Sequence, residues 1–265
     1  DHHGEFQAAL LLTAVLVLGV LAIDTGSALH HGRRPWAWAV LALGTAMMAA
    51  ALGFDLHQTT KGAYALSRNF YGVLKVTEHH MGEPSEHRLV LQHGGTTHGL
   101  QYTDPNLRQL PGTYYTATSG VGRLFQADRP AGGRKVAVVG LGTGSLSAWG
   151  RAGDTFRFYE INDDIVKLAR GTFTFLRDTK AKVELAMGDA RLSLEREPSQ
   201  GFDIIVLDAF SSDAIPVHLL TDEAISTYLR HLAPGGTLAV HISNRSLNLE
   251  PVVMLLAERH RLQAA

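Results

Sequence analysis

A short apolar run that ends in a glycine-rich turn constrains the fold of this chain more than any other segment. The run is Val136–Gly144, with the sequence VAVVGLGTG, and a helical pattern follows it. Glycine lets the backbone turn sharply and approach a ligand where a Cβ atom would block it. Glu160 directly follows the next apolar run, Thr155–Tyr159, where a carboxylate can accept hydrogen bonds from ribose hydroxyls. The candidate nucleoside-binding residues of this strand–loop–helix unit are therefore Gly140, Gly142, Gly144 and Glu160.

The spacing of the glycines indicates the kind of nucleoside. A dinucleotide site requires G-x-G-x-x-G or G-x-G-x-x-A, and Ser145 stands at its last position here. The observed G-x-G-x-G favours an S-adenosyl-type ligand, which has no pyrophosphate to hold. Asp189 and Ala190 follow a further strand-like run, Lys182–Ala186, and we expect the carboxylate to reach an adenine edge. Asp189 also suits the N-cap of a helix, and the two roles are compatible.

Strand and helix patterns alternate from Lys135 onward, which is typical of a mostly parallel sheet with helices on both faces. Strands are predicted at 135–139, 155–160, 182–186, 202–208 and 236–243, and helices near 145–150, 162–170, 190–196, 218–232 and 249–260. Thr221 or the residues just before it are expected to cap the fourth helix, and the turn Pro234–Gly236 to lead into the last strand. Upstream, alternating runs at 71–77, 88–92 and 97–102 predict a small antiparallel sheet, and 114–125 predicts a helix.

Two uncharged segments, Gln7–Ile23 and Trp36–Phe54, come before these patterns. Both reach the length that crosses a bilayer, the first only barely, and Trp36 lies where an interfacial aromatic residue is expected. We predict two transmembrane helices, with a signal peptide or a buried soluble hairpin as the alternatives. Basic residues flank both ends of the second segment, so charge does not set the orientation. Residues 55–68 are polar and mixed, which is typical of a linker.

The chain is thus predicted to divide into three parts. They are two transmembrane helices at 1–58, a small β-rich part at 59–128, and a Rossmann-like core of the S-adenosylmethionine-dependent methyltransferase type at 129–265. Sheets of that type carry two further strands, so the chain is expected to continue beyond Ala265.

Composition excludes several classes of function. The formal net charge of -1 gives no electrostatic footprint for nucleic acid. The absence of cysteine excludes disulfides and thiolate metal sites. The 14 histidines do not follow the spacing of a metal site on any predicted element, so no metal is expected.

Asp208 is the candidate catalytic residue, because it directly follows the apolar strand Phe202–Leu207 and strand ends of such sheets face the ligand. Asp213 lies on the same loop, as an acceptor-binding residue or, alternatively, as a helix cap or solvated turn. Two carboxylates beside a nucleoside suit a cationic substrate such as a diamine. The attacking amine must be neutral, and lowering its pKa from ~10 to 7 costs about 4 kcal/mol. A carboxylate that takes the proton during attack reduces that barrier.

Three segments together resemble the spermidine synthase family. They are DAFSSDAIPVHLLT at 208–221, RNFYGVL at 68–74 and VGLGTG at 139–144. The chain is most similar to the membrane-fused bacterial branch of that family, in which transmembrane helices precede the synthase-like domain. The resemblance spans roughly residues 65–265 and implies transfer of an aminopropyl group from decarboxylated S-adenosylmethionine to an amine such as putrescine, with methylthioadenosine as the product.

The resemblance also implies roles for single residues. The glycine loop and Glu160 would bind the nucleoside, Asp189 the adenine, and Asp208 would position and deprotonate the amine. Gln101 and Tyr114 match the substrate-contacting Gln and Tyr of the family, and Tyr115 is an equal candidate. The implied partners are a small diamine or polyamine and membrane lipid, with a homodimer also open. The implied location is the bacterial inner membrane, multi-pass, with the catalytic domain in the cytoplasm.

The chain departs from the family in its acceptor region. Soluble spermidine synthases have a tighter D-x-x-D loop than Asp208–Asp213 and a Tyr-His-Glu triplet where this chain has Tyr114-Tyr115-Thr116. This departure leaves the identity of the amine open. Two other functions stay open as well: a methyltransferase that uses intact S-adenosylmethionine, and a non-catalytic domain that senses polyamines or nucleosides on a membrane protein.

Overall fold

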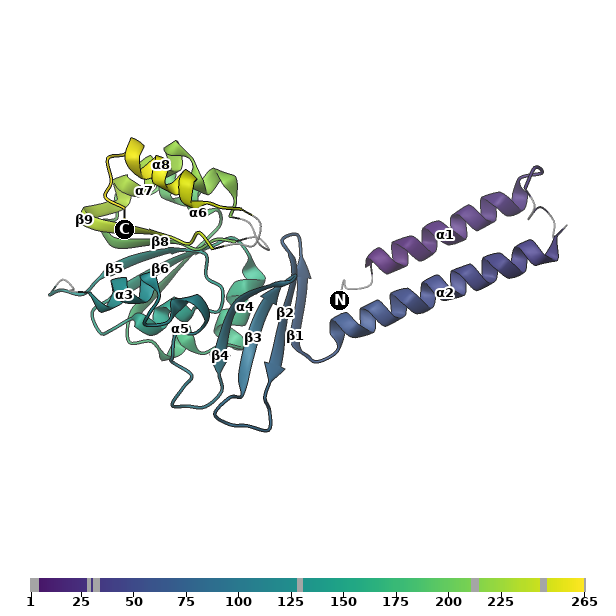
Figure 1. The fold of residues 1–265 in the computed structure, drawn as a ribbon, viewed down its shortest axis with the longest axis horizontal. Helices are drawn as coiled ribbons and strands as arrows, with labels where there is room; N and C mark the ends of the chain where they lie inside the picture. Colours follow the sequence, from purple (N-terminus) through teal and green to yellow (C-terminus); the bar gives the residue numbers. More distant parts are fainter. Residues whose placement is uncertain are drawn as a thin grey trace. The chain divides into compact units, whose positions relative to one another are not determined.

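The computed structural model describes residues 5–27, 30, 34–127, 131–210, 215–243 and 247–264 (Figure 1). The chain forms two compact units, Asp1–Ala63 and Tyr64–Ala265. The finer predicted division of the second unit near residue 128 stays a prediction.

The first unit contains helices α1 (Glu5–Ile23) and α2 (Pro35–Thr60). Proline suits the first position of α2, where no backbone N–H is needed. Among the described residues one helical segment, the 21 residues of Pro35–Asp55, is long and apolar enough to cross a membrane. The apolar part of α1, Ala8–Ile23, is shorter. A helix rises 1.5 Å per residue, and a bilayer core is about 30 Å thick. Of the two predicted transmembrane helices, α2 therefore has the required apolar length and α1 does not.

A four-stranded sheet with the order β1-β2-β3-β4 opens the second unit. Its strands are β1 (Ala63–Asn69), β2 (Gly72–His79), β3 (Arg88–His93) and β4 (Thr96–Tyr102). β3 pairs antiparallel with both β2 and β4, which confirms the three predicted strands. The predicted linker at 55–68 is wrong, because α2 continues to Thr60 and β1 follows. The sequence of β1, AYALSRN, lacks the alternation that would have predicted a strand.

A five-stranded sheet of parallel strands forms the centre of the second unit and has the order β7-β6-β5-β8-β9. The strands are β5 (Lys135–Val139), β6 (Thr155–Glu160), β7 (Lys182–Met187), β8 (Phe202–Leu207) and β9 (Leu232–Val240). All five were predicted, but β9 begins earlier than expected. The segment Pro234–Gly236 lies inside β9, where the pairing with β8 shifts register, rather than in a turn before the strand.

Helices cover both faces of the parallel sheet (Figure 1). The cover consists of α3 (Gly120–Gln126), α4 (Asp163–Gly171), α5 (Phe175–Asp178), α6 (Ala190–Arg196), α7 (Asp222–His231) and α8 (Glu250–Arg259). Alternate residues of β5 enter two separate cores. Val136 and Val138 pack with the small sheet, α3 and α4, whereas Ala137 and Val139 pack with α6, α7 and α8. The predicted sheet with helices on both faces is therefore confirmed.

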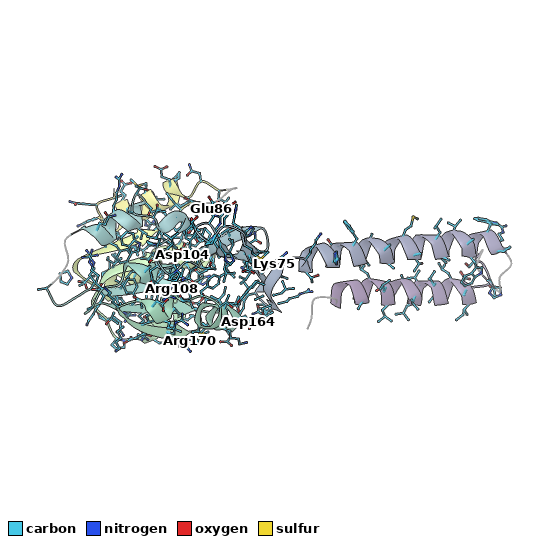
Figure 2. All side chains as sticks on the ribbon, turned by 90° about the horizontal axis from the view of Figure 1, so that it is seen from below. Lys75, Glu86, Asp104, Arg108, Asp164 and Arg170 are labelled. Carbon is cyan, nitrogen blue, oxygen red and sulfur yellow. The ribbon has the colours of Figure 1, made fainter. Side chains whose placement is uncertain are left out.

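Polar contacts connect the small sheet to α4. Asp164, which Figure 2 labels, lies in the first turn of α4. It accepts hydrogen bonds from Ser67 Oγ at 2.6 Å and Asn69 Nδ2 at 2.8 Å, both on β1. Asn69 also donates to Asn162, the N-cap of α4, at 2.6 Å. The Lys167 ammonium and these donors hold the pKa of Asp164 below its usual range. The small sheet is thus attached beside the loop that follows β6.

Two predicted helices differ from the structure. The helix expected at 114–125 is divided into a 3₁₀ turn, η2 (Thr113–Tyr115), and α3, which Ser119 caps. A Cβ atom at Gly122 would lie 2.0 Å from the carbonyl oxygen of Thr116, so this close packing requires glycine. The helix expected after β5 is only a 3₁₀ segment, η3 (Ser145–Trp149). The predicted cap at Thr221 is confirmed, because its side chain accepts the Ala224 N–H.

Candidate functional site

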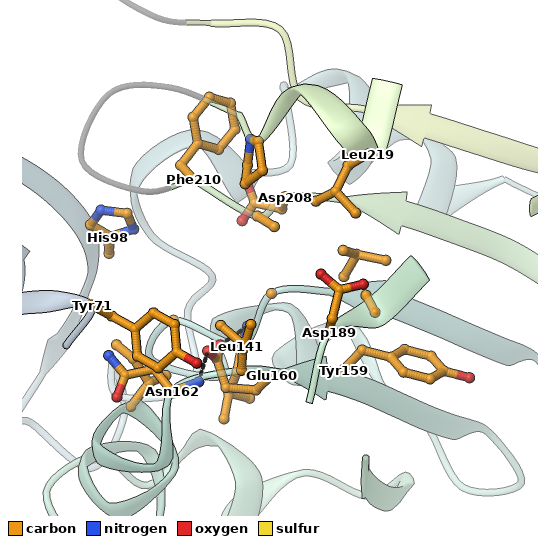
Figure 3. A pocket seen from close by; sticks show the side chains of 18 of the residues that line it. Tyr71, His98, Leu141, Tyr159, Glu160, Asn162, Asp189, Asp208, Phe210 and Leu219 are labelled. Atoms are coloured by element: carbon orange, nitrogen blue, oxygen red, sulfur yellow. Dashed lines mark hydrogen bonds between the residues drawn. The ribbon is translucent and has the colours of Figure 1, made fainter. Parts of the chain in front are cut away.

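A cavity of about 200 Å³ lies where the strand order reverses, at the carboxyl ends of β5 and β8. This position is where open α/β sheets bind their ligands. Figure 3 shows Asp208 and Phe210 on one side of the cavity and Tyr71, Asn162 and Glu160 on the other. Of the predicted site residues, the cavity lining includes Tyr114, Gly140, Gly142, Glu160, Asp189, Ala190 and Asp208. Gln101, Tyr115 and Gly144 are not part of the lining, and Asp213 lies outside the described residues.

The backbone geometry of the loop requires glycine at three positions, independently of any ligand. Gly140 has φ +98°, and a Cβ atom there would lie 2.5 Å from the carbonyl oxygen of Asp208. Gly142 has φ +54°, in the left-handed region. Gly144 has φ +82° and is the N-cap of η3, and a Cβ atom there would lie 2.7 Å from Leu176 Cδ2. Gly144 therefore packs against Leu176 and is not part of the cavity lining.

Glu160 fastens the glycine loop to the end of β6. Its carboxylate is buried and accepts the backbone N–H of Leu141 at 3.0 Å and that of Asn162 at 2.8 Å. Burial raises the pKa of Glu160, and the backbone hydrogen bonds oppose that rise. A carboxylate has about four lone-pair sites, so these backbone donors leave acceptor capacity for a hydroxyl donor of a ligand.

Asp189 is the predicted helix cap and also lines the cavity, and its contact with adenine stays a prediction. Its Oδ1 accepts the Leu192 N–H at 2.9 Å, which caps α6, and it lines the cavity. Its Oδ2 lies 2.8 Å from Nε2 of His218. His218 belongs to η4 (Val217–Leu220) and also lines the cavity. Its presence was not predicted, although it lies within the segment that carries the family resemblance.

Asp208 is paired with His241, which sequence reasoning missed. Oδ1 of Asp208 lies 2.5 Å from Nδ1 of His241, the residue that follows β9. Burial raises the pKa of Asp208, and the hydrogen bond and charge of His241 pull it down. Burial and the charge of Asp208 raise the pKa of the neighbouring Tyr114, which keeps its hydroxyl protonated. The predicted strand 236–243 placed His241 inside a strand; a boundary at 240 would have revealed it as a strand-end residue.

The small sheet contributes an aromatic wall to the cavity that was not predicted. Tyr71, His93 and His98 line it. Nε2 of His93 lies 2.7 Å from the carbonyl oxygen of Tyr71, and the two histidine ring centroids are 5.5 Å apart. Tyr71 lies in the turn between β1 and β2, within the RNFYGVL segment. Strand alternation alone does not say which face of a small sheet meets a ligand.

Gln101 and Tyr115 have structural contacts instead of a place in the cavity. Gln101 is buried, and its amide donates to the Arg108 carbonyl and Thr174 Oγ1, both at 2.9 Å, and accepts the Thr174 N–H. The Tyr115 ring is buried in the core, and its carbonyl accepts the Trp149 Nε1–H at 3.1 Å. Of the two tyrosine candidates, Tyr114 is the one that reaches the cavity.

Comparison with known proteins gives a distant relationship. No family model matches the chain. The chain is similar to the polyamine aminopropyltransferase of Vibrio vulnificus, with 29% identity over 151 residues, which cover 55% of this chain and 48% of that protein. The chain thus spans about half of the length of this curated relative.

Solved structures show the same fold. The probable spermidine synthase from Corynebacterium glutamicum superposes with a TM-score of 0.53 at 17% identity, over 66% of this chain and 62% of the other. The spermidine synthase from Thermotoga maritima gives 0.50 at 16% identity, over 74% and 62%. The chain therefore has a Rossmann-like fold of the S-adenosylmethionine-dependent methyltransferase type with an N-terminal four-stranded sheet, and its sequence is distantly similar to that of a polyamine aminopropyltransferase.

Proposed function

We propose that this chain transfers an aminopropyl group from decarboxylated S-adenosylmethionine to an amine. One observation carries the proposal: the reversal of strand order brings Asp208 into the same cavity as the glycine loop, Glu160 and Asp189. The distant similarity to a polyamine aminopropyltransferase supports it. A further spermidine synthase with the same fold, at a TM-score of 0.50 and 15% identity, is described in complex with the transition-state analogue AdoDATO.

The proposed chemistry assigns the two ends of the cavity to two substrates. Gly140, Gly142, Glu160 and Asp189 would hold the nucleoside, and Asp208 would receive the amine. The amine nitrogen attacks the carbon next to the sulfonium, and the carbon–sulfur bond breaks with its electron pair going to sulfur, which leaves methylthioadenosine. Asp208 takes the proton that the nitrogen loses. The Tyr114 hydroxyl, kept protonated beside Asp208, is a hydrogen-bond donor for the carboxylate or the amine.

Membrane attachment belongs to the same proposal. The segment Pro35–Asp55 of α2 would anchor the chain through a single span, with side chains such as Leu43, which is 61% exposed, facing lipid. Membership in the membrane-fused branch and a cytoplasmic location of the cavity remain proposals. The donor is made inside the cell, which is the reason to expect the cytoplasmic side.

The test of the proposed reaction is a direct assay of the full chain in detergent. The protein is incubated with a panel of monoamines, diamines and polyamines and with either decarboxylated or intact S-adenosylmethionine, and products are identified by mass spectrometry. We expect aminopropylated amine and methylthioadenosine. Asp208→Asn should lower turnover by roughly 10²–10⁴-fold while the affinity for methylthioadenosine is kept.

Asp203→Asn is the matched control, because Asp203 belongs to the same strand but binds the backbone N–H of Lys135 at the opposite end of the sheet. It should leave turnover unchanged. Methylated amine from intact S-adenosylmethionine would show a methyltransferase instead. Binding of methylthioadenosine without turnover of either donor would indicate a sensing domain.

A further inference from the structure

We propose that His241 is a positioning residue, which donates its Nδ1 hydrogen to Asp208 and thereby keeps that carboxylate charged and oriented for the incoming amine. The inference deepens the aminopropyl-transfer function proposed above and rests on it. It concerns a residue that is absent from the predicted site and does not itself line the cavity. His241 acts through Asp208, which does line it.

The pairing of β8 with β9 determines the position of His241. The two strands run parallel with Leu207 opposite Val240, so Asp208 and His241 are the next residues on adjacent strands. The backbone N–H of His241 donates to the carbonyl oxygen of Leu207 at 3.0 Å. The side-chain hydrogen bond at 2.5 Å is therefore supported by a backbone hydrogen bond beside it.

Aromatic rings hold the imidazole of His241 on two sides. Its centroid is 4.4 Å from that of Tyr114 and 4.8 Å from that of Phe210. An ionised carboxylate only accepts hydrogen bonds, so a neutral His241 must carry its hydrogen on Nδ1 to form this contact. The contact occupies one acceptor position of Asp208 and leaves others for the amine.

The charges around the pair explain why a donor is needed there. Burial raises the pKa of Asp208, which favours a neutral carboxyl that could not accept a proton. His241 opposes that effect, whereas Tyr114, the other titratable group that faces Asp208, is kept protonated. The remaining acidic groups in the lining are Glu160, bound to the glycine loop, and Asp189, paired with His218. His241 is thus the group that offsets the burial of Asp208.

Two substitutions separate the hydrogen bond from the packing. His241→Phe keeps an aromatic ring between Tyr114 and Phe210 but has no donor, whereas His241→Asn keeps an N–H near the position of Nδ1 and loses the ring. We expect His241→Phe to shift the acidic limb of the pH profile of kcat/KM to higher pH. It should also lower kcat by less than the roughly 10²–10⁴-fold loss expected for removal of the base itself. His241→Asn should restore the acidic limb toward that of the parent.

His260→Phe is the matched control, since His260 lies 3.1 Å from Asp222 in another His–Asp pair that does not line the cavity. It should leave the profile unchanged. Methylthioadenosine affinity, measured by calorimetry, reports that each variant is folded. An unchanged acidic limb in a folded His241→Phe variant, with the parent active, would overturn the role of His241 and leave the proposed function intact.

A second measurement does not depend on turnover. ¹⁵N NMR of the histidine-labelled full chain, with His241→Phe for assignment, should show that Nδ1 of His241 carries a hydrogen, and Asp208→Asn should change its ¹⁵N shifts. A hydrogen on Nε2 instead, or shifts that do not respond to Asp208→Asn, would overturn the pair. Absence of aminopropyl transfer by the parent with every amine would overturn the proposed function, and the NMR result would then decide the pair by itself.

Discussion

At the scale of single residues, Asp208 meets two opposing demands. A base must be ionised to accept a proton, yet the burial of Asp208 disfavours its charge. His241 offsets part of this cost and Asp208 still keeps a raised pKa. A residue held in this way should lower the stability of the fold in exchange for its function.

This conflict predicts how the stability of Asp208→Asn depends on pH. Below the usual pKa of aspartate the carboxyl is neutral in both the folded and the unfolded chain, and burial costs no charge. As the pH rises from about 4 toward the raised folded pKa, the unfolded chain ionises first and the parent loses about 1.4 kcal/mol of stability for each pH unit of this window. The advantage in Tm of Asp208→Asn over the parent should therefore grow through the window, measured by thermal unfolding at a series of pH values.

The control is again Asp203→Asn. Asp203 accepts the Lys135 N–H, so its substitution should give no advantage that grows with pH. A pH-independent difference between Asp208→Asn and the parent would mean that the carboxyl ionises in the fold as it does in water.

Sequence reasoning found the residues that directly follow a strand and missed those that depend on a partner elsewhere. Gly140, Glu160 and Asp208 each end a strong apolar run, and parallel strands bring such ends together whatever the details of packing. His241 is placed by a register between β8 and β9 that no local pattern encodes. Gln101 matched a family position, but both of its amide N–H groups and its amide oxygen bind Arg108 and Thr174.

At the scale of elements, prediction succeeded where the hydrophobic period was strong. β5, β6, β7 and β8 are apolar runs bounded by polar or glycine residues, and α4, α6 and α7 begin at side-chain caps. The failures are elements whose stability comes from tertiary contacts. β1 has no regular alternation and is held by Asp164. The predicted helix is interrupted between Tyr115 and Gly120, and Gly122 packs against the Thr116 backbone.

The cap of α7 gives a prediction at this scale. Thr221 Oγ1 accepts the Ala224 N–H at 3.2 Å and the Arg191 guanidinium at 3.1 Å. Thr221→Ala should lower the free energy of unfolding by about 1 kcal/mol, since it removes an N-cap. Denaturant unfolding measures this change. Ser226→Ala, at an exposed position of the same helix, should have almost no effect, and an equal loss in both variants would contradict the capping role.

At the scale of the whole molecule, the two compact units differ in where their apolar side chains lie. The second unit buries two apolar cores of its own, whereas α1 and α2 expose large apolar side chains along their length. The two uncharged segments predicted both helices of the first unit. The absence of charge alone, however, did not show that the apolar part of α1 is too short to cross a membrane.

A pair of arginine substitutions tests the single span. Leu43 in α2 and Leu16 in α1 are both 61% exposed, so they form a matched pair. An arginine at the centre of a spanning helix costs about 2.5–3.5 kcal/mol. Leu43→Arg should therefore shift the chain from the membrane fraction to the soluble fraction, and Leu16→Arg should shift it much less, as measured by flotation with lipid vesicles. Equal shifts would restore the two-span interpretation.

The contact between Gly140 and the carbonyl oxygen of Asp208 has a consequence for how two ligands would influence each other. The glycine loop and the segment after β8 meet there with no room for a Cβ atom, so neither can move toward the other without a clash. A nucleoside that holds the glycine loop in one conformation would also restrict the backbone of Asp208. Any gain in amine affinity from this source is a coupling free energy, and it must appear equally in the affinity for the nucleoside when the amine is bound first.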